Sequence, residues 1–323
     1  MAIPIALPIA RPVASKAAAR LSTSNANRQR FRRRLMCSLS SEHMFFKGGD
    51  LALRTTYITL AQAEAIAVGL SPRDQAILFD LARVRVLSGA QLTRLHFAAL
   101  TLESRERTRR RVLARLVELH VAVALDRTIG GARAGSAGHV YSLGIAAQRV
   151  LPLLDGGAYA DGLMGRTRAP ATPGSLFLTH ALAVAELYVR LREHERAGKL
   201  TLAHFAAESG AWWPDGRGGA IKPDAYGCVR RGDVEDCWWI EVDRATESLP
   251  TLKRKLTAYA DFARTRQTGP DDVVPRVIVT VPHDRRLADV RDLVGGLSAP
   301  GPEMILPVPH ERAVPTVIDI LWG

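Results

Sequence analysis

Apolar residues between positions 70 and 120 recur at the spacing of amphipathic helices. Ser71, Pro72 and Asp74 form a typical helix start, because serine caps free N–H groups, proline suits the first turn and an acid complements the helix dipole. The apolar positions that follow keep the 3.6-residue period: Ile77, Leu78, Leu81 and Ala82. A second, shorter helix is predicted from Ser88, and a third from about 104 to 119.

Two short runs typical of strands follow the third helix. They cover residues 121–127 and 139–143, and a Gly-rich, basic segment at 129–136 joins them. Three helices followed by a β-hairpin is the order of a winged helix-turn-helix, whose third helix enters the major groove of DNA. The sequence therefore predicts a winged helix-turn-helix DNA-binding domain over residues 56–155.

The second half of the chain alternates helical and strand patterns. The predicted order is helix, three strands, helix, strand, helix and strand, which indicates a mixed α/β domain over residues 176–323. The predicted helices cover 177–197, 249–265 and 284–294, and the predicted strands include 200–208, 221–229, 276–281 and 303–307. A segment rich in Gly, Pro and small residues at 156–175 predicts a linker between the two domains.

The first 55 residues lack the pattern of a folded domain. Met1 to Val13 alternates Pro with small apolar residues, and the stretch that follows is rich in Ala, Ser, Asn and Arg. We expect a disordered basic arm. Two interpretations of this arm remain open: a tail that binds phosphates, or an upstream extension without a function.

Charge is distributed unevenly along the chain. The net charge of +12 comes from the first half, with +7 over residues 1–69 and +6 over 70–155, whereas 156–323 carries −1. A basic front half favours nucleic acid, here double-stranded DNA, as the partner. No apolar run reaches the roughly 18 residues of a membrane span. The three cysteines lack metal-site spacing, and neither a zinc site nor a disulfide framework is indicated, which fits a reducing cytoplasm. We expect Cys228 and Cys237 to be packing residues.

Arginines crowd the exposed flank that we expect for the third helix. This flank ends with Arg115, and its candidate DNA-binding residues are Arg105, Arg107, Arg109, Arg110 and Arg111. Arg127 and Arg133 of the predicted wing are expected to meet the flanking phosphates. A solvated surface with no DNA contact is the alternative for such an arginine-rich face.

Three acids gather in the two strands of the second half that precede the helix at 249–265. Side chains two apart share a face of a strand, so Glu241 and Asp243 point the same way. If the two strands pair across the turn at 230–233, Asp224 joins them. Crowded carboxylates repel unless a cation or a proton lies between them, and oxygen ligands favour a hard ion such as Mg²⁺.

These residues also carry a family resemblance. Pro223-Asp224 followed by Glu241-Val242-Asp243 resembles the Pro-Asp…(Asp/Glu)-x-Lys signature of restriction-endonuclease-like nucleases. The span from about Leu70 to Val294, about two thirds of the chain, resembles the actinobacterial replication-relaxation family. The matching pieces include the segments 70–78, 116–119, 139–144, 178–180, 222–225, 241–248 and 253–256, and Tyr259. The resemblance implies a winged helix joined to a nuclease-like domain and an association with plasmid replication or mobilisation. It also implies other replication or transfer proteins as further partners.

When the signature is matched position by position, the resemblance implies that Asp224 and Glu241 are metal ligands at the scissile phosphate. Asp243 stands where the signature has lysine, and it adds a third candidate ligand but no positive charge. Lys255 on the following helix is the nearest replacement, because it borders the inward stripe of that helix, whereas Lys253 is expected to face water. Glu186 is a candidate accessory acid, and His180 is expected to be a cap or a core histidine.

Two interpretations of the acid cluster remain open. In one, the chain is a Mg²⁺-dependent DNA endonuclease. In the other, basic groups such as Arg244 and Lys255 neutralise the acids as a structural ion-pair network, and the chain is a non-enzymatic DNA-binding regulator or replication accessory factor with a degenerate nuclease fold. Lys255 decides between them. A gap of about 4–6 Å to the acid oxygens leaves room for metal and phosphate, whereas direct contact favours a salt bridge.

Overall fold

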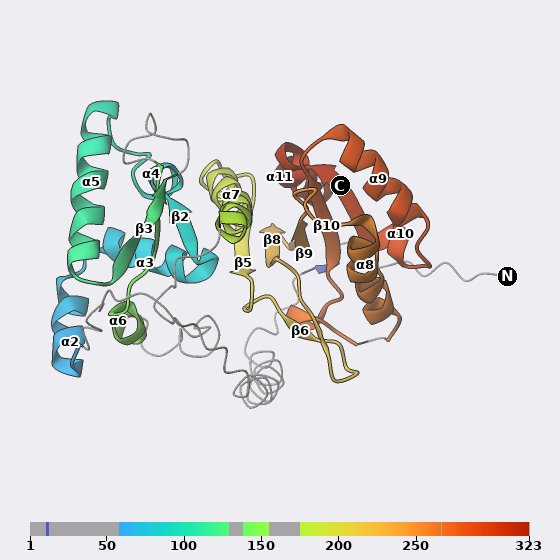
Figure 1. Ribbon diagram of the computed structural model, residues 1–323, viewed down its shortest axis with the longest axis horizontal. Helices are drawn as coiled ribbons and strands as arrows, with labels where there is room; N and C mark the ends of the chain where they lie inside the picture. Colours follow the sequence, from blue (N-terminus) through green and yellow to red (C-terminus); the bar gives the residue numbers. More distant parts are fainter. Residues whose placement is uncertain (1–10, 13–57, 129–137, 155–174, 266, 323) are drawn as a thin grey trace, which may run out of the picture.

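The computed structural model describes residues 11–12, 58–128, 138–154, 175–265 and 267–322, which form a mixed α/β structure (Figure 1). Most of the basic arm expected at 1–55, the tip of the wing and all but the last residue of the linker at 156–175 lie outside these ranges. Arg11 and Pro12 form β1, a two-residue strand that pairs antiparallel with the start of β9 (Val234–Val242).

The front half consists of helices around a small antiparallel sheet. Its helices are α2 (Leu60–Gly69), α3 (Pro72–Val84), α4 (Gly89–His96), α5 (Leu102–Glu118) and α6 (Ala147–Leu154). Its strands β2 (Val86–Ser88), β3 (Ala122–Thr128) and β4 (His139–Leu143) lie in the order β2-β4-β3. The predicted helix starts are confirmed, since the Ser71 and Ser88 side chains accept hydrogen bonds from the backbone N–H groups of Asp74 and Gln91.

Three elements of this half were not predicted. The helix α2 has small or apolar residues nearly all round, so it shows no helical periodicity. The strand β2 has only three residues, and it exists because Val86 to Ser88 pair with the middle of β4. The helix α6 contains Pro152, which disfavours a helix in a sequence-based prediction.

The second half is built on a mixed sheet with the strand order β11-β10-β9-β8-β5 (Figure 1). Its other strands are β5 (Thr201–Ala207), β8 (Ala225–Arg231), β10 (Arg276–Val281) and β11 (Ile305–Pro309). Strands β9, β10 and β11 run parallel, whereas β8 is antiparallel to both β9 and β5. The predicted hairpin between the two acid-bearing strands is confirmed, and Gly232 takes the positive φ that its tight turn requires.

Helices cover both faces of this sheet. One face carries α7 (Ser175–Arg196) and α11 (Ala313–Trp322), and the other carries α8 (Leu249–Arg264), α9 (Asp284–Gly295) and α10 (Gly301–Met304) (Figure 1). The strand alternation follows the prediction for β9, because Trp238, Ile240 and Val242 pack toward α7 and α11, and Trp239 packs toward α8. Neither α10 nor α11 was predicted. A two-stranded ribbon of β6 (Trp213–Pro214) and β7 (Ala220–Ile221) precedes β8.

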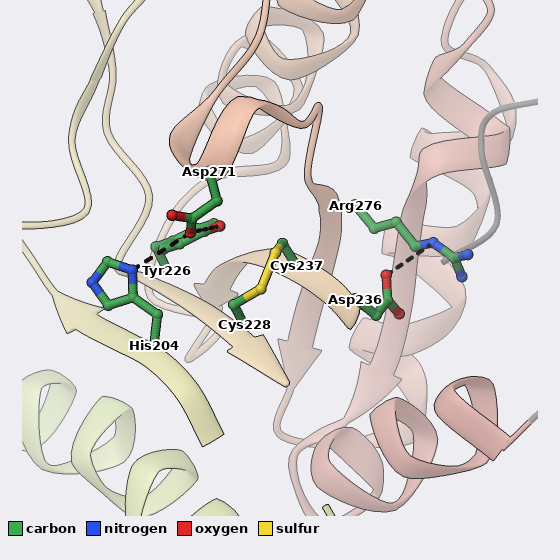
Figure 2. Close-up of a disulfide and its surroundings, with 7 residues drawn as sticks. All are labelled: His204, Tyr226, Cys228, Asp236, Cys237, Asp271 and Arg276. Atoms are coloured by element: carbon green, nitrogen blue, oxygen red, sulfur yellow. Dashed lines mark hydrogen bonds and ion pairs between the residues drawn. A yellow bond between two sulfur atoms is a disulfide. The ribbon is translucent and has the colours of Figure 1, made fainter. Parts of the chain in front are cut away.

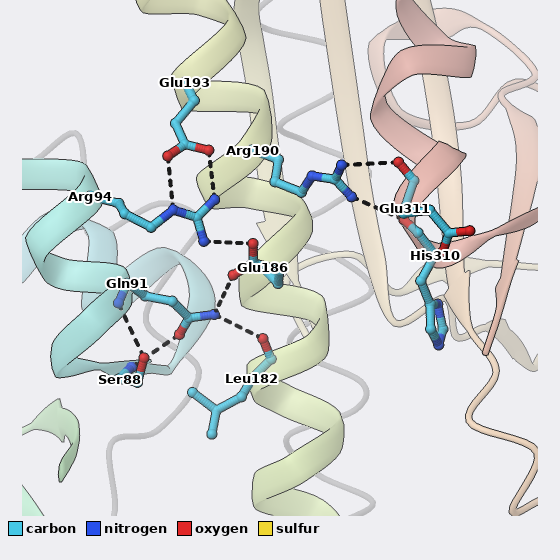
Figure 3. Close-up of polar contacts among 9 residues, drawn as sticks. All are labelled: Ser88, Gln91, Arg94, Leu182, Glu186, Arg190, Glu193, His310 and Glu311. Carbon is cyan, nitrogen blue, oxygen red and sulfur yellow. Dashed lines mark hydrogen bonds and ion pairs between the residues drawn. The ribbon is translucent and has the colours of Figure 1, made fainter. Parts of the chain in front are cut away.

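The helix α7 joins the two halves into one body, because a single hydrophobic core runs from α3 through α7 to the sheet. A polar network lies beside that core (Figure 3). Arg94 of α4 binds both carboxylate oxygens of Glu193 at 2.8 and 2.6 Å and Glu186 at 2.6 Å. The Gln91 side chain donates to the Leu182 carbonyl and to Glu186. The Glu186 carboxylate therefore binds residues of α4 and links the two halves. The expectation that it is an accessory acid of the site is wrong.

The expectation that Cys228 and Cys237 are simply packing residues is also wrong. Cys228 of β8 and Cys237 of β9 form a disulfide (Figure 2). The hairpin register places them directly opposite each other on the face that packs toward α8, with a Cα–Cα distance of 4.1 Å. The cysteine spacing alone does not reveal this pairing, although the predicted turn at 230–233 already places the two residues nearly opposite each other.

Within the residues described, no helix combines the length and the apolar character that a membrane crossing requires.

Candidate functional site

The β8–β9 hairpin brings two of the three predicted acids together. Asp224 directly precedes β8, and Glu241 is the penultimate residue of β9, at the same end of the hairpin. The Val242 backbone N–H donates to Asp224 Oδ2 at 2.7 Å, which fixes that carboxylate beside β9. Both acids line a cavity of about 400 Å³. The prediction that three acids meet at one spot is therefore confirmed for Asp224 and Glu241.

Lys255 extends from α8 into the same cavity. The helix begins at the N-cap Ser248 and buries Leu252, Leu256 and Tyr259 against the sheet, as the periodicity predicts. Lys255 borders this stripe, and its Nζ lies 3.6 Å from Asp224 Oδ1 and in direct contact with Glu241 Oε2. The separation is shorter than a metal and a phosphate require, so the geometry of this state favours a salt bridge.

Glu241 is the most enclosed acid of the site, with only 2% of its surface exposed. Burial and the neighbouring Asp224 charge raise its pKa to about 8, although Lys255 and Tyr259 act in the opposite direction. Tyr259 donates its phenolic O–H to Glu241 Oε1. Burial opposes the charge of Lys255, but Glu241 and Asp224 outweigh it and raise the lysine pKa. Lys255 therefore stays a cation.

His180 of α7 completes the cavity wall, a position that the sequence did not reveal. Its Nε2 lies 3.3 Å from Asp224 Oδ1. This hydrogen bond raises the pKa of His180. Burial works against ionisation of Asp224, but His180 and Lys255 together lower its pKa. His180 and Asp224 are 44 positions apart, and only the packing of α7 on the sheet brings them together.

Asp243 shares the cavity wall but is bound elsewhere. Its Oδ2 accepts from Arg286 Nε of α9 at 2.5 Å, and its Oδ1 accepts from the Ala245 N–H at 2.8 Å. Arg286 also donates to the Glu247 carbonyl. Arg244, the cation expected to neutralise the acids, is exposed and donates to the Thr179 carbonyl.

The three carboxylates are consequently not assembled as one ligand set. Across the described ranges, the one group of three or more candidate metal ligands whose donor atoms all lie within 4.8 Å of one another is Cys228, Glu235 and Cys237.

The arginines of α5 divide into two groups. Arg107, Arg110 and Arg111 are exposed and follow one another at helical spacing, so they form one basic face. Arg109 is only 1% exposed and donates to the Gly89 carbonyl and Thr93 Oγ1. The expectation that Arg109 lies on the exposed flank is therefore wrong.

Two further arginines of α5 are also engaged within the protein. Arg105 donates to the carbonyls of Ala98 and Leu100, and Arg115 forms an ion pair with the buried Asp74. Arg127 lies in β3, but its side chain is outside the described part of the structure, as is all of Arg133. The described basic face of α5 thus consists of three arginines.

Comparison with known proteins gives one match. The family described as replication-relaxation matches residues 78–277, which is more than half of the chain and includes α5, the hairpin and Lys255. No curated protein and no solved structure matches the sequence.

Proposed function

The chain belongs to the replication-relaxation family, and from that premise we propose that it is a DNA-binding protein of plasmid or mobile-element replication or transfer. The family suggests the role in replication or transfer. The face of Arg107, Arg110 and Arg111 on α5 is the observation that carries the proposal of DNA binding. Its partner is double-stranded DNA.

The arrangement around α5 supports a winged helix. The order α3-β2-α4-α5-β3-β4 has the helix order and the hairpin of that fold, and β2 extends the hairpin into a three-stranded sheet. In this fold the third helix, here α5, enters the major groove. The three exposed guanidinium groups then neutralise phosphates or bind base edges, and each phosphate contact makes binding weaker as salt increases.

A binding assay with matched variants tests this proposal. We expect the affinity for duplex DNA to fall with salt, and each of Arg107→Ala, Arg110→Ala and Arg111→Ala to lower the affinity and to reduce the salt slope by about one where the arginine binds a phosphate. Arg291→Ala, an exposed arginine on α9, is the matched control. Equal affinity of all four variants and the wild type would contradict the proposal.

The pocket supports a second candidate function, metal-dependent hydrolysis of the DNA backbone. The specific observation is that Asp224, Glu241 and Lys255 meet in a cavity of about 400 Å³ at the end of a sheet with helices on both faces. A restriction-endonuclease-like fold has such a site. Asp224 and Glu241 would hold a divalent ion such as Mg²⁺, which activates water and stabilises charge on the phosphate.

In this candidate function, the two carboxylates, Lys255 and Asp243 have different roles. Two carboxylates suit a hard ion, but they fit it only when the Lys255 ammonium leaves the Glu241 oxygen, since both cations compete for the same acceptor. A displaced Lys255 stays in the cavity as a positive charge for the phosphate. Asp243 stays with Arg286 and is not a ligand in this arrangement.

The alternative is a non-enzymatic replication accessory factor, and the direct Lys255 contact favours it. Supercoiled DNA with Mg²⁺ or Mn²⁺ separates the two. Nicking that is lost in Asp224→Asn and Glu241→Gln but kept in Asp233→Asn, an exposed acid at the hairpin turn, supports the hydrolase. Retained DNA affinity without nicking under any divalent ion supports the accessory factor.

A further inference from the structure

A second cluster of candidate ligands lies toward the other end of the same hairpin. It consists of Cys228, Cys237 and Glu235, whose sulfur and carboxylate donor atoms all lie within 4.8 Å of one another. Cys228 and Cys237 face each other across the strands, and Glu235 is two residues before Cys237, so it shares that face of β9. We call these three residues the thiol cluster.

We propose that the thiol cluster, once its disulfide is reduced, binds a thiophilic divalent cation of the Zn²⁺ class. Thiolate sulfur and carboxylate oxygen are ligands that Zn²⁺ accepts, and two thiolates select it over Mg²⁺. The strand register already holds both sulfurs side by side, so little chain entropy is lost when the ion binds. Three protein ligands leave a fourth position for water, on the half-buried side where Glu235 lies.

The surroundings of the cluster exclude its other neighbours as ligands. Asp236 points to the opposite face, where it pairs with Arg276 at 3.6 Å (Figure 2). His204 lies beside Cys228 on β5, but its ring packs edge-on against Tyr226 and its Nδ1 faces Asp271 at 3.6 Å. Both side chains are therefore held away from the sulfurs.

Glu235 is the feature that a simple disulfide does not explain. Among the described residues, its half-buried carboxylate takes part in no hydrogen bond or ion pair. The two cysteines beside it are almost fully buried, with residue exposures of 1% for Cys228 and 6% for Cys237. A bound cation would neutralise this carboxylate and the two thiolates together, and it would stabilise charges that the apolar surroundings disfavour.

The reduced state follows from the proposed function, on which this step rests, because a protein that works on DNA inside a cell meets a thiol-reducing compartment. A dithiol reductant supplies two electrons and two protons, the S–S bond breaks, two thiols form and the reductant becomes a disulfide. Binding of the cation then releases the two thiol protons to water. The disulfide and the cation site are thus alternative states of the same two sulfurs.

Co²⁺ is the probe that tests the site in the full chain. We expect the protein reduced with a phosphine to bind Co²⁺ with a thiolate-to-cobalt charge-transfer absorption, and Zn²⁺ to abolish that absorption by displacement. Cys228→Ser and Cys237→Ser should each remove the band, and Glu235→Gln should weaken the affinity by about tenfold or more. The oxidised protein should show no band.

Matched controls exclude other sites. Cys37→Ser removes the remaining thiol, and Asp224→Asn removes an acid of the pocket, so both should keep the band. A measurement without any variant gives the same answer. Alkylation of the buried Cys228 and Cys237 in the reduced wild type requires local opening of the hairpin, and Zn²⁺ should slow it.

Absence of the band in the reduced wild type, or alkylation unaffected by Zn²⁺, would overturn the proposal. Neither readout uses DNA. Failure of the cation site therefore leaves the proposed DNA binding untouched, and failure of DNA binding leaves these readouts intact.

Discussion

Lys255 contacts Glu241 directly inside a cavity that also holds Asp224. The lysine comes from α8, and the acid comes from the end of β9, so the contact ties the helix to the sheet. A buried carboxylate without a cation is strongly destabilising, whereas a buried pair with good geometry is close to neutral. The contact therefore keeps a cation beside Asp224 and Glu241 in the absence of a divalent ion.

Replacement of this lysine should destabilise the protein. We expect Lys255→Met to lower the free energy of unfolding by about 2 kcal/mol, because two buried acids lose their common cation. Urea unfolding measures the change. Lys253→Met is the matched control, since Lys253 is exposed on the same helix and should change stability by less than about 0.5 kcal/mol. Equal effects of the two variants would contradict the structural role of Lys255.

The His180–Asp224 pair predicts a pH dependence. Asp224 raises the pKa of His180 above its ordinary 6.5, so the folded protein holds the proton more tightly than the unfolded chain does. The stability contributed by the histidine is complete below pH 6.5 and is lost as the pH rises through the raised value. The lowered pKa of Asp224 gives the other limit, since its contribution is complete above 3.8 and is lost as the pH falls through the lowered value.

Nuclear magnetic resonance can follow this titration directly. In the presence of a chelator, the His180 ring should titrate above 6.5 in the wild type and closer to 6.5 in Asp224→Asn. His180→Asn should therefore cost more stability at about pH 5.5 than at about pH 9, by about 1 kcal/mol. A titration that does not respond to Asp224→Asn would show that the pair is not formed.

Neighbouring arginines of α5 should respond in opposite ways to the same substitution. Arg109→Ala removes a buried guanidinium that binds α4, and it should lower the free energy of unfolding by about 2 kcal/mol. Arg110→Ala should leave stability within about 0.5 kcal/mol and lower DNA affinity. Thermal unfolding and a binding assay on both variants measure this. Reversed effects would place the basic face on the wrong side of the helix.

The contact of Arg94 with two glutamates should hold the front half on α7. The three groups are partly exposed, so we expect Arg94→Met to cost only about 1 kcal/mol. Hydrogen exchange should nevertheless speed up in α4 and in the facing turns of α7, because the bonds that cross between the halves are lost. Arg192→Met is the control, since Arg192 pairs with Glu195 within α7 alone.

Local patterns were sufficient to predict much of this fold. The capped helices α3 and α4, the β8–β9 hairpin and the stripe of α8 depend on neighbours in the sequence, and all three are confirmed. The burial of Arg109 had a usable signal, because Arg109 lies four residues before Leu113 and seven before Leu116 and so shares their buried face. Charge alone predicts exposure for Arg109, but an internal carbonyl and a hydroxyl accept hydrogen bonds from its guanidinium.

The remaining features depend on tertiary packing. The placement of His180 beside Asp224, the capture of Asp243 by Arg286 and the position of β2 beside β4 join residues that are 44, 43 and about 55 positions apart. No periodicity encodes such pairs. The strand pattern of β9 predicts which face of the sheet Asp243 occupies, but it does not predict that Arg286 is its ion-pair partner.

The double packing of α7 has a consequence for dissecting this protein. Tyr188 is fully buried, with its ring 5.1 Å from Phe205 of the sheet and its hydroxyl bonded to Asp80 of the front half. A C-terminal fragment that begins at α7 would expose the apolar side of that helix that packs against the front half, and it would be prone to aggregation. Replacement of the front half by another domain should therefore succeed only when that domain supplies residues that pack against the Tyr188 side of α7.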